Sequence, residues 1–255
     1  MLKTIDAKDL YYIDAKGLYY KELNDLVQEA VNDGANKLVL KNVNGQRYIG
    51  TRVAKPVEID ITGVPGNDLG AYMNGSTIIV RDNGQDAIGN TMNAGKIVVH
   101  GHAGDVLGYA MRGGKLFIKG DVGYRVGIHM KEYEDNVPVI VIGGTAGSFL
   151  GEYMAGGILV LLGLNREQGQ SAAGDYLGTG MHGGVIYVRG KVDKSGIGKE
   201  VSVFELNEED EKKLSGVLSE YCIDLGIDYK EVRKEKFVKL VPVSHRPYGN
   251  LYTAC

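Results

Sequence analysis

A single hydrophobic pattern recurs along the chain between residues 63 and 190. Each copy contains an aliphatic residue, a glycine, two variable residues and a methionine, and is followed by a short β-branched and aliphatic run typical of a strand. Successive methionines lie 19, 19, 19, 24 and 27 residues apart, and every methionine except Met1 belongs to this column. The glycine and methionine columns are Gly70 and Met73, Gly89 and Met92, Gly108 and Met111, Gly127 and Met130, Gly151 and Met154, and Gly178 and Met181. Such regular spacing identifies an internal repeat.

The length of the unit restricts the architecture that it builds. Helical repeats need about 33 residues or more, whereas a unit of 19 residues with one strand and glycine corners suits one coil of a β-helix. We therefore expect a mainly β protein, a parallel β-helix of about six or seven glycine-rich coils. At ~4.8 Å per coil, six coils form a rod roughly 30 Å long. The two longer spacings predict loop insertions around Glu132 to Asn136 and around Asn165 to Gly169.

Side chains alternate between the two faces of a strand, so the strand runs predict which residues form the core. The methionines are expected to fill an inner corner as adaptable packing residues. The two inward columns are predicted to be Ile78, Ile97, Leu116, Val139, Leu159 and Ile186, and Val80, Val99, Ile118, Val141, Leu161 and Val188. Six apolar residues between them are predicted to point outward: Ile79, Val98, Phe117, Ile140, Val160 and Tyr187. Because a solvated sheet face carries polar residues, we expect a cover, either the chain's own flanking helix or another subunit, and treat these six residues as a candidate interface.

The segments on either side of the repeat divide the chain into three predicted parts. Residues 1–60 are expected to form an N-terminal α+β segment packed on the β-helix, residues 61–200 the β-helix, and residues 201–255 a C-terminal helix and arm. Within the first part, apolar residues at helical spacing predict a helix, and Asn44 with Gly45 predicts a hairpin turn. The tandem segments IDAKDLYY and IDAKGLYY at 5–20 are interpreted as an extension of a terminal strand.

A second helix is predicted after the repeat. Asn207, followed three residues later by Asp210, has the pattern of a helix cap, and the helix is expected to end near Gly226. The tail after residue 235 is expected to pack on this chain or to reach a partner.

Composition excludes several classes of partner. Glycine makes up 38 of 255 residues, about 15% against a usual ~7%, which fits the glycine corners of the repeat. The net charge of −3 gives no electrostatic reason to bind nucleic acid or an anionic membrane. No apolar run has the roughly 18 residues that a membrane helix needs, and no signal peptide is recognisable, so we expect a cytoplasmic protein.

Candidate catalytic and metal-binding patterns are weak. GTGMHG at 178–183 matches Gly-x-Gly-x-x-Gly, but a dinucleotide site needs this pattern after a strand and at the start of a helix, and here it precedes a strand. The histidines His100, His102, His129, His182 and His245 show no metal-ligand spacing supported by cysteines or carboxylates. His100 and His102 fall in columns that hold other polar residues in neighbouring copies, so we expect solvated coil positions.

The remaining reactive residue types also have structural explanations. Cys222 falls within the predicted second helix and Cys255 is the last residue, so neither is expected to be an activated nucleophile. The repeat aspartates are interpreted as Asx-type turn formers: Asp86, Asp105, Asp121 and Asp175. No residue is therefore nominated as catalytic, cofactor-binding or metal-binding.

With these motifs in place, the chain resembles the GXGXG family, which includes the C-terminal domain of the glutamate synthase large subunit and, more distantly, one of the subunits of formylmethanofuran dehydrogenase. The resemblance is carried by GNDLGAYM, GDVLGYAMRGGKLFIKGDVGYRVGIHM, GGTAGSFLGEYMAGG and GDYLGTGMHGG. In the flanks, KNVNGQRYIG at 41–50, LSEYC at 218–222 and LVPVSHRPYG at 240–249 resemble the stand-alone glutamate synthase domain of archaea and some bacteria. The doubled IDAK segment departs from the family, so the resemblance gives no structure for the first 20 residues.

The resemblance implies a right-handed β-helix that is a structural part of an enzyme making two glutamates from glutamine and 2-oxoglutarate. In that enzyme the glutaminase uses an N-terminal cysteine, and the synthase carries FMN and an iron–sulfur cluster. This chain starts Met1-Leu2 and has no cysteine cluster, so FMN and the cluster are expected on a partner subunit and no cofactor on this chain.

Four hypotheses remain open at this point. The first is a non-catalytic scaffold of a glutamate synthase that holds glutaminase and FMN-containing synthase subunits, and the second is a scaffold in a formyl-transfer complex. The third is an enzyme in its own right, such as a hydrolase, although no residue can be nominated for it. The fourth is a homo-oligomer that buries the outward apolar face against another copy.

Overall fold

The computed structural model of the chain describes residues 3–4, 10–167 and 170–243. The strands are β1 (Lys3–Thr4), β2 (Leu10–Asp14), β3 (Lys37–Asn44), β4 (Glu58–Val64), β5 (Asn74–Val80), β6 (Ala94–Val99), β7 (Lys115–Ile118), β8 (Val139–Ile142), β9 (Ala155–Leu161), β10 (Gly183–Arg189), β11 (Val201–Glu205) and β12 (Phe237–Pro242). The helices are α1 (Tyr20–Asn32), α2 (Glu208–Leu225) and α3 (Tyr229–Val232), and Lys194–Gly196 forms a 3₁₀ turn.

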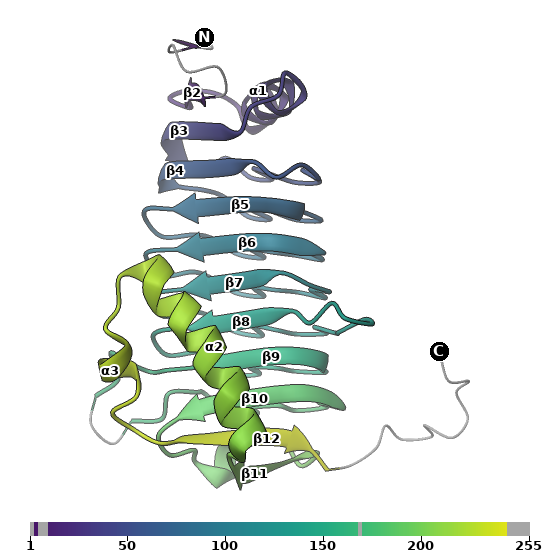
Figure 1. The fold of residues 1–255 in the computed structure, drawn as a ribbon, viewed down its shortest axis with the longest axis vertical. Coiled ribbons are helices and arrows are strands. Elements are labelled where there is room, and N and C mark those ends of the chain that lie inside the picture. Colours follow the sequence, from purple (N-terminus) through teal and green to yellow (C-terminus); the bar gives the residue numbers. More distant parts are fainter. Residues whose placement is uncertain (1–2, 5–9, 168–169, 244–255) are drawn as a thin grey trace.

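Strands β2 to β10 stack in chain order as parallel neighbours, one strand per coil. Figure 1 shows them as a tall rod with one wide sheet face. The predicted mainly β, parallel-coil architecture is therefore confirmed. No helix among the described residues combines the length and the apolar character needed to cross a membrane.

Both ends of the rod are closed by elements that do not continue the parallel ladder. At the N-terminal end, α1 buries Leu23, Val27, Ala30 and Val31 in the main core, as its helical spacing predicts. At the other end, β12 pairs antiparallel with β10, and β11 pairs antiparallel with β12. Solenoid proteins need such caps because the last coil otherwise exposes its apolar interior.

Two further copies of the repeat flank the six that methionine marks. Gly50 and Val53 form one of them. Gly70 N donates to Ile49 O at 2.8 Å, which matches the bond from Gly89 N to Leu69 O in the next coil, and Asn74 N donates to Val53 O at 2.9 Å. Gly198 and Val201 form the other, with Gly198 N donating to Leu177 O at 2.8 Å. In both terminal copies a buried valine takes the place of methionine.

The hairpin predicted at Asn44 and Gly45 is wrong. β3 and β4 pair in parallel, because the chain between them makes a complete coil through Gly50 instead of reversing at once.

β2 pairs in parallel with β3, and Ile13 in the second IDAK copy is buried in the core. The predicted boundary at residue 60 falls inside β4.

The glycine of each unit lies at a corner with an unusual backbone. At Gly70, and at the residues two before and two after it, φ is positive (66° at Gly70, 61° at Asp68, 58° at Tyr72), and the same alternation recurs in the following coils. A Cβ on Gly70 would lie 2.6 Å from Ile97 Cδ1 in the interior, so a side chain at this positive φ would both strain the backbone and displace Ile97. Asp68 and Tyr72 tolerate the left-handed conformation because each also donates its N–H to the next coil, to Asp86 O at 3.0 Å and Asn90 O at 2.9 Å.

The core follows the predicted columns with one exception. All six repeat methionines are buried in the main core, which confirms their role in packing. In β8, however, Leu116 pairs with Ile140 and Phe117 with Val141, so Ile140 points inward and Val139 and Val141 point outward, the reverse of the prediction. Four consecutive aliphatic residues give no alternation from which the register could be read.

Candidate interaction site

α2 packs on the outward apolar stripe of the sheet. Val98, Phe117, Val160 and Tyr187 point outward as predicted, Val141 replaces Ile140 among them, and all five are buried. α2 covers them with Leu214, Leu218, Tyr221, Cys222 and Leu225. Figure 1 shows α2 crossing this face of the sheet from β12 towards β6. Of the two predicted covers, the chain's own helix occupies the site, and Ile79 on β5 lies beyond it, half-buried.

The predicted cap of α2 is confirmed. Asn207 Oδ1 accepts from Asp210 N, and Asp210 Oδ2 accepts from Asn207 N, both at 2.9 Å. The helix ends at Leu225, and its capping residue Gly226 has a φ of 64°, the left-handed conformation that glycine favours.

Buried aromatic contacts hold the middle of α2 against the sheet. The rings of Tyr221 and Phe117 meet edge-on, with centroids 5.6 Å apart. The Tyr221 hydroxyl donates to Ile118 O at 3.2 Å, and burial raises the pKa of this phenol far above its usual value. A Cβ on Gly143 would lie 2.3 Å from that hydroxyl, so the missing side chain at Gly143 makes room for Tyr221.

Ion pairs at one end and a hydrogen bond at the other fix the same helix. At its C-terminal end, Lys96 of β6 lies 2.6 Å from Asp224 and 3.3 Å from Glu220, and Lys115 of β7 also pairs with Glu220. Burial tends to raise the pKa of the Glu220 carboxyl, but the two lysines hold it below its usual value. At the N-terminal end, Asp210 accepts from the Tyr187 hydroxyl at 2.9 Å.

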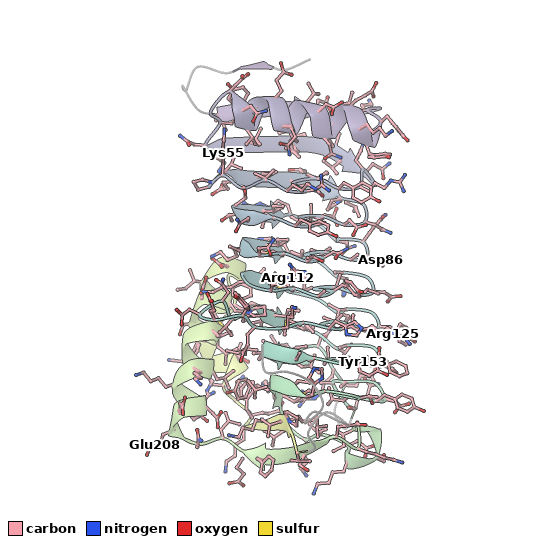
Figure 2. The ribbon with its side chains drawn as sticks, turned by 90° about the vertical axis from the view of Figure 1, so that its right-hand side faces the viewer. Lys55, Asp86, Arg112, Arg125, Tyr153 and Glu208 are labelled. Atoms are coloured by element: carbon pink, nitrogen blue, oxygen red, sulfur yellow. The ribbon has the colours of Figure 1, made fainter. Side chains whose placement is uncertain are left out.

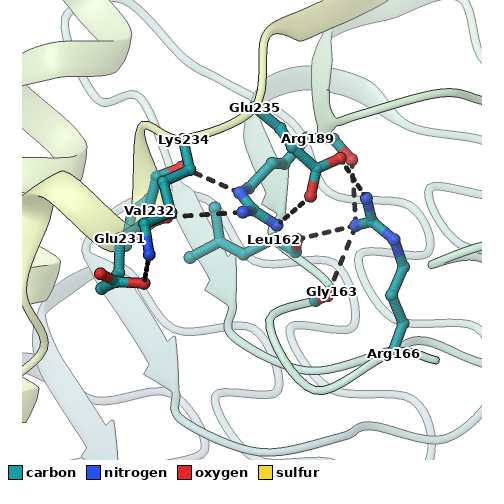
Figure 3. A network of polar contacts seen from close by, with 8 residues as sticks. All are labelled: Leu162, Gly163, Arg166, Arg189, Glu231, Val232, Lys234 and Glu235. Atoms are coloured by element: carbon teal, nitrogen blue, oxygen red, sulfur yellow. Dashed lines mark hydrogen bonds and ion pairs between the residues drawn. The ribbon is translucent and has the colours of Figure 1, made fainter. Parts of the chain in front are cut away.

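A second polar network attaches the segment that follows α2. Glu235 lies between two guanidinium groups, 2.8 Å from Arg189 Nη1 and 2.5 Å from Arg166 Nη2 (Figure 3). Arg189 also donates from Nε to Val232 O at 2.9 Å. This network joins the coil of β10 and the loop after β9 to α3, so the helical cover is tied to the rod beyond the end of α2 as well.

The sheet face beyond α2 has a different character. There Lys37 pairs with Glu58 at 2.6 Å, and Arg81 forms two hydrogen bonds with Asp60, at 2.6 and 3.1 Å. The outer face thus changes from ion-paired and solvated on β3 to β5 to apolar and covered on β6 to β10, as expected when one face is only partly packed.

The repeat aspartates do more than form turns. Asp86 Oδ1 accepts from Asp105 N at 2.9 Å, and Asp105 Oδ1 accepts from Tyr124 N at 2.8 Å, each in the next coil. Asp121 Oδ1 accepts from Thr145 N at 2.7 Å in the same manner. The Asx-turn interpretation is corrected for these three residues, because their side chains bridge consecutive coils.

The histidines occupy varied environments. His102 continues a polar ladder, since its N–H donates to Asn83 Oδ1 at 2.7 Å and its Nδ1 accepts from Asp121 N at 2.9 Å. His100 is half-buried instead of solvated, and burial together with Arg81 and Lys119 lowers its pKa. His129 and His182 are exposed, and His245 lies outside the described residues.

The other predicted positions carry no reactive arrangement in the part of the chain that the structure describes. Cys222 is buried on the sheet side of α2, where burial raises its thiol pKa, and Cys255 lies outside the described residues. GTGMHG forms one corner of the solenoid, in which Gly178 and Gly180 have positive φ. Within residues 3–4, 10–167 and 170–243, no three His, Cys, Asp or Glu side chains are grouped to hold a metal ion.

One exposed feature was not found by sequence reasoning. Two rows of side chains, five rings and the guanidinium group of Arg125, lie on the corners opposite α2, and we call them the aromatic strip. The strip consists of Tyr109, His129 and Tyr153 in one row and Arg125, Phe149 and Tyr176 in the other. In Figure 2, Arg125 and Tyr153 lie on the side of the rod away from α2.

Contacts along each row order the rings of the aromatic strip. His129 stacks on Tyr153 with centroids 5.4 Å apart, and Tyr109 meets His129 edge-on at 5.9 Å. In the other row, Phe149 stacks on Tyr176 at 4.8 Å, and the Arg125 guanidinium lies 4.6 Å from the Phe149 centroid. Arg125 Nε is also 3.0 Å from Glu152 Oε2, which links the rows.

Comparison with known proteins identifies the family. The sequence model of the GXGXG motif matches residues 22–243. The chain belongs to the GXGXG family. The family resemblance deduced from the sequence is thus confirmed.

Two individual proteins similar to this GXGXG chain extend the result. The chain is 49% identical over 256 residues to an uncharacterized protein of Methanocaldococcus jannaschii, covering 98% of this chain and 95% of that protein. Its fold is similar to a chain in the crystal structure of the formyltransferase/hydrolase complex from Methylorubrum extorquens in complex with methylofuran. That likeness has a TM-score of 0.63 at 19% identity, and covers 94% of this chain and 97% of the other.

Proposed function

We propose that this chain is a non-catalytic structural subunit of a glutamate synthase, the enzyme that converts glutamine and 2-oxoglutarate to two glutamates, and that it positions a glutaminase subunit and an FMN-containing synthase subunit. The observation that carries the proposal is the GXGXG family match across residues 22–243. The resemblance of the segments at 41–50 and 218–222 to the stand-alone glutamate synthase domain supports this choice of enzyme.

The chemistry of the described residues supports a structural role. The carboxylates of Asp86, Asp105 and Asp121 are engaged in bridging coils, and Asp210 and Glu235 are engaged in attaching the helical cover. A catalytic carboxylate would instead need an open position beside a second group with a matched pKa.

A formyltransferase-type complex is the alternative. It is favoured by the fold similarity to a chain of such a complex over nearly the whole length of both chains. Both proposals give this chain the same physical task, a rigid rod against which larger subunits are held, and they differ in the subunits that bind.

Co-expression distinguishes the two proposals. With tagged glutaminase and FMN-containing synthase subunits from the same genome, we expect a stable complex in which glutamine-dependent glutamate formation falls at least tenfold when this chain is omitted. A parallel preparation uses the subunits of a formyltransferase complex. Assembly with that second set alone contradicts the glutamate synthase role.

Two further measurements test the structural role itself. The isolated chain is assayed for glutamine hydrolysis and for glutamate formation, and turnover by this chain alone contradicts a non-catalytic role. Light scattering of the isolated chain gives its mass, and a stable homo-oligomer that excludes both sets of subunits favours the homo-oligomer hypothesis instead.

A further inference from the structure

The aromatic strip does not follow from the needs of the repeat. In the coils of Gly89 and Gly108, the column that holds Phe149 and Tyr176 holds Ala87 and Val106, and the column that holds His129 and Tyr153 holds Thr91 and Ala110, whereas Tyr48 and Tyr72 stand in these columns nearer the N-terminus. These coils have the same backbone and the same hydrogen bonds between coils with small side chains. The fold of these columns therefore does not require rings.

Four of the five rings of the strip are exposed, Phe149 is half-buried, and contacts between neighbouring rings order them. The exposed fraction is 47% for Tyr153 and 55% for Tyr176, although monomeric proteins seldom leave a contiguous row of aromatic side chains in water. Tyr153 stacks on His129 and also lies over Gly180, where a Cβ would approach its Cδ1 to 2.3 Å. Rings already ordered in this way lose little conformational entropy on binding, and aromatic residues and arginine are enriched at the residues that contribute most to binding at protein interfaces.

The spacing along the first row suits an α-helix that lies parallel to the rod. Neighbouring rings in the first row are 5.4 and 5.9 Å apart, close to the ~5.4 Å pitch of a helix, so each turn of a partner helix can rest against one coil. The opposite face of the same rod already holds a helix, α2, across the strands from β6 to β10.

The charges around the strip favour a cationic partner. Arg125 and Glu152 pair with each other. In the sequence, exposed Asp175 directly precedes Tyr176, and the exposed loop that follows His129 and Met130 carries Glu132, Glu134 and Asp135 against one cation, Lys131. Exposed ring faces also attract guanidinium and ammonium groups.

We infer that the aromatic strip is the docking surface for an amphipathic α-helix, rich in arginine and lysine, of a partner subunit. The helix lies along the rod, with its apolar side chains on the rings and its cations against the bordering carboxylates. This inference rests on the proposed role as a structural subunit, and it names the surface that performs that role in place of the apolar stripe that α2 covers.

The test compares tyrosines inside and outside the strip. Tyr153→Asn combined with Tyr176→Asn removes two rings from the strip, whereas Tyr72→Asn removes a ring that is 49% exposed and has a φ of 58°, but lies two coils outside the strip in the column of Tyr153. Asparagine tolerates the positive φ at all three positions. Affinity for the purified partner subunits is measured by calorimetry, and thermal unfolding shows whether each variant is folded.

We expect the double variant to bind at least thirtyfold more weakly than the wild type, with an unchanged unfolding temperature, and the Tyr72 variant to bind within about twofold of it. Equal affinity of the double variant and the wild type overturns the inference while leaving the structural role intact. Failure of the wild-type chain to bind any of these subunits overturns the proposed function, and the inference with it.

Photo-crosslinking tests the helical occupant. A benzophenone side chain is placed at Tyr109 or at Tyr153, two coils and ~10 Å apart along the rod. We expect both to capture one partner segment, at sites about seven residues apart, since seven residues of helix rise ~10.5 Å. Capture of a second copy of this chain, or of a segment without arginine and lysine, overturns the inference.

Discussion

The ring of Tyr221 on α2 meets the ring of Phe117 on β7 edge-on, with centroids 5.6 Å apart and planes inclined at 77°. These residues are 104 positions apart in the sequence, and their contact joins the helical cover to the middle of the rod. The sequence left two covers open for Phe117, the chain's own helix or another subunit, and the chain's own helix covers it.

Truncation of Phe117 therefore tests the packing of α2 on the sheet. Phe117→Ala is expected to lower the free energy of unfolding by about 3–5 kcal/mol, because it leaves a cavity under the helix. Ile79→Ala, in the same outward column but beyond α2, is expected to cost about 1 kcal/mol. Urea unfolding followed by circular dichroism measures both, and equal costs would contradict the position of α2.

Glycine substitutions separate backbone strain from steric conflict. Gly216→Ala, within α2 and with open space around it, is expected to stabilise the protein by ~0.5–1 kcal/mol. Gly75→Ala, with a φ of 112° but no neighbour within 4 Å, should destabilise by ~1–2 kcal/mol. Gly95→Ala adds a Cβ only 2.2 Å from Ser76 O and should cost more than about 3 kcal/mol. A different order of the three melting temperatures would contradict the coil geometry.

Asp121 provides a test of the side-chain bridges between coils. Asp121→Ala leaves Thr145 N without its acceptor and is expected to cost ~1–2 kcal/mol at pH 7, whereas Asp121→Asn keeps an oxygen at that place and should cost less. The comparison uses the free energies of unfolding in urea.

The same aspartate has a defined pH dependence. Burial tends to raise the pKa of Asp121, but hydrogen bonds from Thr145 and Asn165 hold it below the ordinary value of 3.8. A carboxyl with a lowered folded pKa stabilises the protein above its unfolded pKa, and the effect is lost as the pH falls through the folded value. The difference between wild type and Asp121→Ala should therefore shrink between about pH 5 and the acid limit of folding, and a constant difference would argue against a charged acceptor.

Arg189 holds the segment around α3, and its removal should release that segment first. Arg189→Met leaves Val232 O and the Glu235 carboxylate without this partner and is expected to cost about 2 kcal/mol. Hydrogen exchange measured by mass spectrometry should accelerate in residues 228–236 more than in β6 or β7. Lys234→Met, which removes an exposed pair with Glu231, is the control and should change stability by less than ~0.5 kcal/mol.

The elements with strong periodic or capping signals were predictable from the sequence. The glycine and methionine columns, the buried side of α1 and the cap of α2 at Asn207 all follow from local rules, because each depends on residues close together in the chain. The two terminal copies of the repeat were missed because Val53 and Val201 stand where methionine marks the others. The register of β8 could not be predicted because all four of its residues are aliphatic, and a register is read from the alternation of apolar and polar residues.

The candidate interface and the aromatic strip depend on contacts across the fold. An apolar stripe on a strand indicates that a cover exists, but whether α2 or another chain provides it depends on where a helix more than a hundred residues away is placed. The rows of the strip combine different positions within the unit, since Tyr109 directly follows its glycine whereas His129 and Tyr153 stand two residues after theirs. Stacking of consecutive coils brings these side chains into one row. An alignment of the repeat copies in the sequence does not show this row, because its members stand in different columns.

The hydrogen bonds that link each coil to the next also determine how the molecule can change in length. A deletion inside one unit breaks the contacts on both sides, whereas removal of a whole unit of 19 residues, such as 89–107, lets Gly108 take the place of Gly89 against Leu69. The rod can therefore lengthen or shorten only in steps of one coil, ~4.8 Å each. The distance along the rod between two binding sites can consequently change only by whole multiples of this step.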